Sequence, residues 1–137
     1  MKKLILALLA VLILTACGRE TPDPQTVSFA LKSNPSTGYS WQVSQSEELF
    51  KVESVYEQAE SAGNLAGAGG VETFTLTPLK PGKTELTLTY VRPWEDGEKA
   101  DQLVYSFEID QNLQVTMTNG YSTAVNEPIP IPTPTIA

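Results

Sequence analysis

Short segments in which apolar and polar residues alternate are the feature that most constrains the fold of this 137-residue chain. The clearest runs from Lys83 to Val91, where Leu86, Leu88 and Tyr90 occupy every second position. Alternation of period two puts one set of side chains on one face of a β-strand, so each segment predicts a strand with one buried face. The predicted strands are Val27–Leu31, Tyr39–Val43, Phe50–Tyr56, Val71–Leu79, Lys83–Val91 and Gln102–Ile109, with Asn112–Thr118 as a further candidate.

Turn sequences separate these segments at intervals of roughly ten residues, as is typical of all-β domains. Lys80-Pro81-Gly82 is one such turn, because proline presets φ and glycine permits a positive φ. Helical periodicity is almost absent. The fold class we predict is therefore all-β, an antiparallel β-sandwich.

The first 16 residues predict an export signal. Lys2 and Lys3 precede the apolar run Leu4–Leu14, which has 11 residues and is too short for a helix across a bilayer core of about 30 Å. Leu14-Thr15-Ala16-Cys17 also resembles the bacterial lipobox, which implies cleavage before Cys17 and acylation of that residue. The alternative is an ordinary secretory signal with an incidental cysteine. We expect a lipid-anchored envelope protein, and Gly18 after the cysteine would suit the outer membrane of a Gram-negative cell.

Length and composition divide the remainder into three parts. Residues 17–26 are polar, contain two prolines and predict a tether. Residues 27–118 are sufficient for one sandwich domain. Residues 119–137 form a proline-rich tail, either disordered or docked along the domain.

The residue types present argue against an enzyme. The chain has no histidine, and Cys17 is its only cysteine, so once that residue is acylated neither a thiol nucleophile nor a Cys/His zinc site remains. Adjacent carboxylates such as Glu47-Glu48 are better explained by a solvated surface. Without the signal, the chain has seven basic and 16 acidic residues, which give a formal charge of −9. This charge argues against binding to nucleic acid. No cofactor or metal is expected.

Asn34-Pro35-Ser36-Thr37-Gly38-Tyr39 lies between two predicted strands and favours a rigid, projecting bend. A loop that is ordered in advance loses less entropy on binding. Tyr39 and Trp41 share one face at strand spacing and would tie the loop to the core. A simple hairpin turn is the alternative explanation.

Two further loops have the composition of contact surfaces. Gly67-Ala68-Gly69-Gly70 lacks bulky side chains, so its backbone could approach another protein, although a flexible linker explains it equally well. Arg92-Pro93-Trp94 follows a predicted strand and presents two residue types that are enriched in binding hot spots. Alternatively, Trp94 could cover the edge of the sandwich.

Together, the three motifs resemble those of the chagasin-type inhibitors of papain-like cysteine peptidases, over roughly Val27 to Ile109. The resemblance implies an immunoglobulin-like sandwich of about seven strands. Its three loops would gather at one end as a wedge that enters the active-site cleft of a papain-like (clan CA) peptidase. The expected function is reversible, competitive inhibition by a monomer, without chemistry by the inhibitor. A lipid-anchored scaffold of the envelope, without peptidase inhibition, is the competing hypothesis.

The resemblance also implies a role for each motif. Ser36 and Thr37 would lie nearest the catalytic cysteine, with serine here where the family usually has threonine. The glycine-rich segment would follow the non-primed side of the cleft, and Arg92 and Trp94 the primed side. The implied peptidase-binding residues are Asn34, Pro35, Ser36, Thr37, Gly38, Tyr39, Gly67, Ala68, Gly69, Gly70, Arg92, Pro93 and Trp94.

Overall fold

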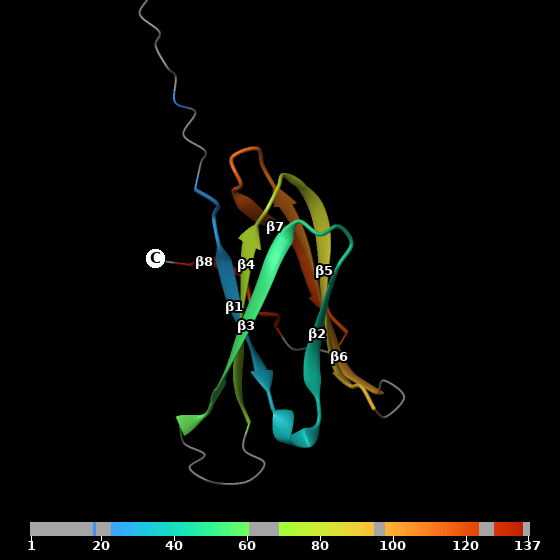
Figure 1. Cartoon of the computed structure of the whole chain (residues 1–137). Coiled ribbons are helices and arrows are strands. Elements are labelled where there is room, and N and C mark those ends of the chain that lie inside the picture. The colour runs from blue at the N-terminus through green and yellow to red at the C-terminus, as the bar shows by residue number, and fades with distance from the viewer. Residues whose placement is uncertain (1–17, 19–22, 61–68, 95–97, 124–127, 136–137) are drawn as a thin grey trace, which may run out of the picture.

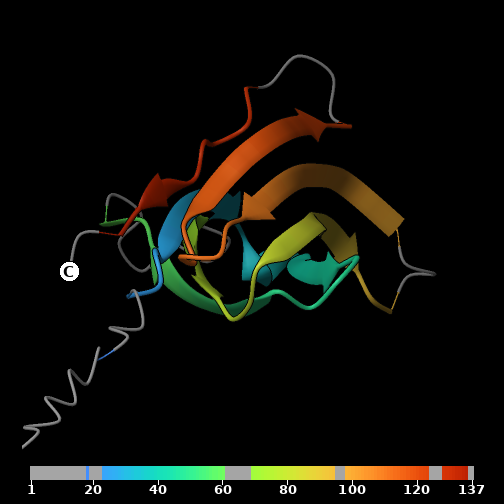
Figure 2. The same ribbon diagram turned by 90° about the horizontal axis from the view of Figure 1, so that it is seen from above.

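Two four-stranded antiparallel sheets pack face to face in the computed structural model, which describes residues 18, 23–60, 69–94, 98–123 and 128–135 (Figures 1 and 2). One sheet has the strand order β3-β4-β1-β8 and the other β2-β5-β6-β7. The predicted all-β sandwich is confirmed. The strands are β1 (Val27–Ser33), β2 (Ser40–Gln45), β3 (Phe50–Gln58), β4 (Gly70–Pro78), β5 (Gly82–Arg92), β6 (Glu98–Ile109), β7 (Val115–Ser122) and β8 (Thr133–Pro134).

The core is made by the inward-facing residues that the alternation identified. Leu86 and Leu88 of β5 are fully buried, as is Tyr105 of β6. Aromatic rings connect the two sheets: the Phe29 ring lies 5.0 Å from that of Tyr105, centroid to centroid, and the Phe50 ring 5.2 Å from that of Phe107. Burial of these large rings is the main stabilising contribution to the sandwich.

The tail is docked over residues 128–135. β8 pairs with β1, and the Thr135 amide donates to the Thr26 carbonyl at 2.8 Å. The Tyr105 hydroxyl donates to the Pro130 carbonyl at 2.9 Å, and Ile129 packs against the core. The tail therefore joins one sheet to the other across an open side of the sandwich (Figure 2).

The structure corrects the predicted boundary at residue 118. β7 continues to Ser122, because Tyr121 still pairs with Val104 and Ser122 with Leu103 of β6. The strand was hard to delimit from sequence because its alternation is interrupted by Asn119 and Gly120, directly after the irregular pairing at Thr118.

Strand direction places the three motifs at one end of the molecule. β1 runs downward in Figure 1, from the end where the chain enters the sandwich to the lower end, where the next turn follows. The start of β4 and the end of β5 lie at the same lower end. None of the helical turns in the described ranges is long and apolar enough to cross a membrane. Cys17 and the predicted export signal lie outside those ranges.

Candidate functional site

The Asn34 loop is closed by its own hydrogen bonds. Pro35–Thr37 form one turn of 3₁₀ helix, labelled η1, with proline at its start. The Asn34 carbonyl accepts from the Thr37 amide at 3.1 Å and from the Thr37 hydroxyl at 2.7 Å. The Ser36 hydroxyl donates to Asn34 Oδ1 at 2.5 Å. Three exposed residues, Pro35, Ser36 and Thr37, are thus presented on an internally bonded turn.

Gly38 ends this turn in the left-handed region, with φ of 85°, and its amide donates to the Pro35 carbonyl at 3.0 Å. The Trp94 ring covers Gly38 so closely that a Cβ at this position would collide with it. Glycine is therefore required both by the backbone and by the neighbouring ring. This contact brings the first and third motifs together.

Arg92 makes a second connection between these motifs. Its Nε donates to the Thr37 carbonyl at 3.1 Å, and its guanidinium carbon lies 4.5 Å from the centroid of the Tyr39 ring. Trp94 remains 68% exposed despite its contact with Gly38. The Trp94 ring therefore offers a large aromatic surface, and its contact with Gly38 orients the ring.

The described part of the glycine motif lies beside the same loop. Gly69 adjoins the Ser33 carbonyl and the Asn34 side chain, and a pocket of about 360 Å³ is lined by both Asn34 and Gly70. Gly70 begins β4, and a Cβ there would collide with the Glu57 carbonyl. Gly70 therefore permits a close approach of two backbones, whereas a Cβ at Gly69 would make only ordinary contacts. Gly67 and Ala68 lie outside the described residues.

Tyr90 lies beneath the site and was not among the residues predicted to form it. Its hydroxyl accepts from the Asn34 amide at 2.9 Å. Its ring stacks on Tyr39 at a centroid distance of 5.1 Å and is tilted against Trp41 at 4.8 Å. The sequence identified Tyr90 only as an inward-facing strand residue, although its place two residues before Arg92 was a signal that it could support the third motif.

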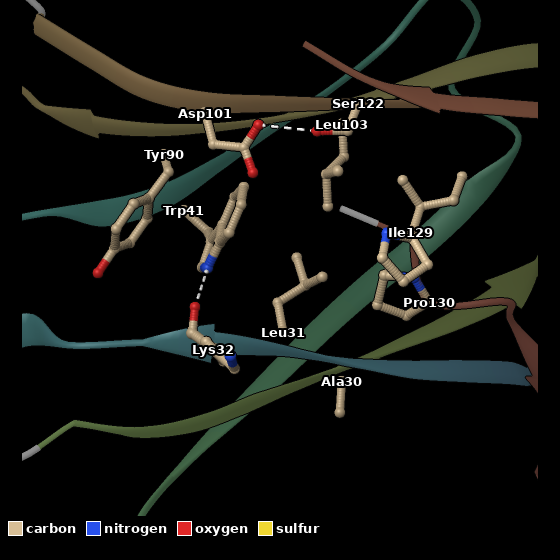
Figure 3. A pocket seen from close by; sticks show the side chains of 11 residues that line it. Ala30, Leu31, Lys32, Trp41, Tyr90, Asp101, Leu103, Ser122, Ile129 and Pro130 are labelled. Atoms are coloured by element: carbon tan, nitrogen blue, oxygen red, sulfur yellow. Dashed lines mark hydrogen bonds between the residues drawn. The ribbon is translucent and has the colours of Figure 1, made fainter. Parts of the chain in front are cut away.

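A cavity of about 560 Å³ adjoins Tyr90 and Trp41 between the sheets (Figure 3). Its walls are mainly apolar, and Ile129 and Pro130 of the tail form part of them. Asp101 is the acidic residue in its lining and accepts from the Ser122 hydroxyl at 3.0 Å. Within the described ranges, no group of three histidine, cysteine or acidic residues could hold a metal ion.

Comparison with known proteins identifies the family. The sequence model of the chagasin family of peptidase inhibitors (I42) matches residues 22–109, more than half of the chain. This chain belongs to the chagasin family. All three loop motifs and strands β1 to β6 fall within the matched region, whereas β7 and the docked tail follow it.

Two relatives show the same relationship in their sequences. Amoebiasin-2 of Entamoeba histolytica is 35% identical over 85 residues, which cover 61% of this chain and 69% of that protein. Chagasin of Trypanosoma cruzi is 40% identical over 76 residues, covering 51% and 67% of the two chains. A crystal structure of a cysteine protease inhibitor from Entamoeba histolytica aligns with a TM-score of 0.49 and 32% identity, over 61% of this chain and 77% of that one.

Family membership decides between the classes of function considered for the sequence. Members of the chagasin family are peptidase inhibitors, so the chain is assigned as an inhibitor and not as an enzyme. This agrees with the inference drawn from the absence of histidine.

Proposed function

We propose that this chagasin-family protein inhibits papain-like cysteine peptidases reversibly and competitively, by inserting the end of the sandwich that carries its three motifs into the active-site cleft. The observation that carries the proposal is the connection of the motifs. Arg92 bonds the Thr37 carbonyl, Trp94 covers Gly38, and Gly69 adjoins Asn34. A surface that is fixed before binding loses little conformational entropy when it binds.

The hydrogen bonding of the Asn34 loop explains how it could occupy the cleft without being cleaved. The carbonyl groups of Asn34, Pro35 and Thr37 each accept a hydrogen bond from within the inhibitor. Attack by a thiolate requires the scissile carbonyl to receive donors from the peptidase, which stabilise the oxyanion. Because three carbonyls of the loop already have partners and the turn is closed by its own hydrogen bonds, we expect the loop to block the nucleophile and not react with it.

The flanking motifs would then contact the walls of the cleft. Trp94, which is two-thirds exposed, would bury its ring on the primed side. Gly69 and Gly70 would approach the non-primed side through their backbone. A single chain carries all the residues required, so the inhibitor would act as a monomer.

We also propose that the chain is a bacterial lipoprotein, anchored in the cell envelope through acylated Cys17, and in the outer membrane if the cell is Gram-negative. The sequence around Cys17 supports this proposal. An anchor at Cys17 would also be compatible with inhibition, because residues 23–26 enter β1 at the end of the domain opposite the three motifs. A tether at that end would leave the inhibitory end free to meet a peptidase. Metabolic labelling with a fatty acid, with Cys17→Ser as control, tests the acylation.

The deciding experiment for inhibition is a titration of papain, or of a cathepsin L-like enzyme, with the soluble domain from Gly18 onward. Residual activity is followed with a fluorogenic peptide. We expect stoichiometric inhibition that competes with substrate and is reversed by dilution. If the folded domain leaves two papain-like enzymes untouched at micromolar concentration, the proposal fails and an envelope scaffold becomes the better explanation.

A further inference from the structure

We propose that Tyr90 is a positioning residue for inhibition, which holds the Asn34 loop and the Arg92 segment in one fixed arrangement. This inference rests on the function proposed above. Tyr90 belongs to none of the three motifs and lies beneath the surface they form, so its role would be exerted through other residues and not through contact with a peptidase.

The backbone places Tyr90 beside an irregular point of the neighbouring strand β6. In the pairing of β5 with β6 the register shifts between Tyr90 and Val91, whereas the pairing with β2 continues regularly, with Trp41 opposite Tyr90. The unpaired residue is Ala100 of β6, and a bulge of this kind increases the local twist of the strand pair. Arg92 follows two residues after Tyr90, so the irregularity lies at the base of the third motif.

The Tyr90 hydroxyl fixes the first residue of the loop. β1 ends at Ser33, whose partner is Gly70, and Asn34 has left the regular strand conformation with φ of −140° and ψ of 83°. At this exit from the sheet the Asn34 amide donates to the Tyr90 hydroxyl at 2.9 Å. The bond spans 56 residues of sequence and connects the first motif to the strand that leads into the third.

The Tyr90 ring fixes the other side of the loop. It lies between Tyr39 and Trp41, at centroid distances of 5.1 and 4.8 Å. Tyr39 in turn lies beneath the Arg92 guanidinium, which also bonds the Thr37 carbonyl. The Tyr90 hydroxyl therefore supports the loop at Asn34, and the Tyr90 ring supports it at Tyr39. Arg92 contacts both Tyr39 and Thr37, which connects the third motif to the same loop.

Tyr90→Phe separates these two contributions, because it keeps the ring and removes the hydroxyl. Tyr121→Phe is the matched control, since Tyr121 is half exposed on β7 and makes none of these contacts. If the Asn34 loop of Tyr90→Phe samples other conformations, the apparent affinity of the variant for a peptidase falls in proportion to the fraction of molecules whose loop is still in the binding conformation. We expect inhibition to weaken about tenfold through a lower association rate constant, with the dissociation rate constant nearly unchanged. The control should match the parent.

The Asn34 amide gives a readout that needs no peptidase. In ¹H–¹⁵N spectra of Tyr90→Phe, but not of Tyr121→Phe, we expect its proton resonance to move upfield and its hydrogen exchange to accelerate. An unchanged Asn34 amide would overturn the proposed anchoring. An altered amide with the parent's association rate constant would overturn the positioning role. If the parent itself does not inhibit, the proposed function fails, while the amide measurement still reports whether the hydroxyl holds the loop.

Discussion

Trp94 combines a high exposure with a close contact that orients its ring. Its ring lies on Gly38, a residue whose positive φ and lack of a side chain both allow that contact. An aromatic side chain held in this way can bury a large area on binding without first losing much rotational freedom.

Replacing Trp94 by alanine tests whether this surface contributes to binding. We expect Trp94→Ala to weaken inhibition of papain by about 2 kcal/mol or more, a factor of about 30, because a desolvated aromatic contact is lost. Inhibition constants and thermal unfolding temperatures of the two proteins are the measurements. The fold should be little affected, since Trp94 is mostly exposed. Equal inhibition constants would exclude Trp94 from the interface.

Tyr105 provides a pH-dependent prediction of stability. Burial raises the pKa of the Tyr105 hydroxyl to about 12, above its ordinary value near 10. Between these values the unfolded chain loses this proton while the folded chain keeps it, so the free energy of unfolding falls as pH rises from about 10 to 12. The contribution is complete below pH 10 and amounts to roughly 2–3 kcal/mol.

Urea unfolding at pH 9, 10.5 and 11.5 measures this contribution. We expect the free energy of unfolding of the parent to decline more steeply over this range than that of Tyr105→Phe, whose side chain does not titrate. The same slope for the parent and Tyr105→Phe would mean that Tyr105 does not cause the decline.

Among the elements, the strands could be predicted well and their long-range partners could not. β5 was recognised from Leu86 and Leu88 because burial on one face leaves a period of two in the local sequence. β8 leaves no such signal, since it has two residues, one of them proline, and exists only through its pairing with β1. Local patterns record which face is buried and not which distant segment covers it.

The same distinction applies to the site. The Asn34 loop and Arg92-Pro93-Trp94 were recognisable because proline, glycine and tryptophan restrict the backbone or mark contact surfaces locally. Tyr90 was missed because its partner Asn34 is 56 residues away, and a tyrosine in an alternating strand has the pattern of any core residue.

The docked tail gives a prediction at the level of the element. Ile129 packs against the core and touches Gly120, where an added Cβ would lie 2.5 Å from its Cδ1 atom. Ile129→Ala should lower the free energy of unfolding by about 1–3 kcal/mol, because it leaves a partly buried site unfilled. Ile131→Ala is the matched control, since Ile131 is 68% exposed and should change stability little.

Chemical denaturation of both variants measures this difference. Inhibition by folded Ile129→Ala should equal that of the parent, because the tail lies away from the three motifs. Equal stability of the two variants would contradict a structural role for the docked tail.

At the scale of the whole molecule, the opposite placement of residues 23–26 and the three motifs predicts how attachment affects binding. A domain from Gly18 onward has no cysteine, so single cysteines can be introduced for immobilisation on a biosensor. Asn112 is exposed in a turn at the tether end, where the Gln25 amide donates to the Leu113 carbonyl. Attachment through Asn112→Cys should therefore leave peptidase binding intact. Attachment through Ser36→Cys should abolish it, and equal binding by the two surfaces would place the interface elsewhere.

The position of β1 also determines how the domain would respond to mechanical load. β1 lies between β4 and β8, and its seven residues run from the tether end to the inhibitory end. A force between these two ends is carried along the covalent backbone of β1, and it loads the β1–β4 hydrogen bonds in shear where the peptidase holds the start of β4. An inhibitor bound by a diffusing peptidase and tethered at its opposite end would therefore be pulled along β1 and not across its hydrogen bonds.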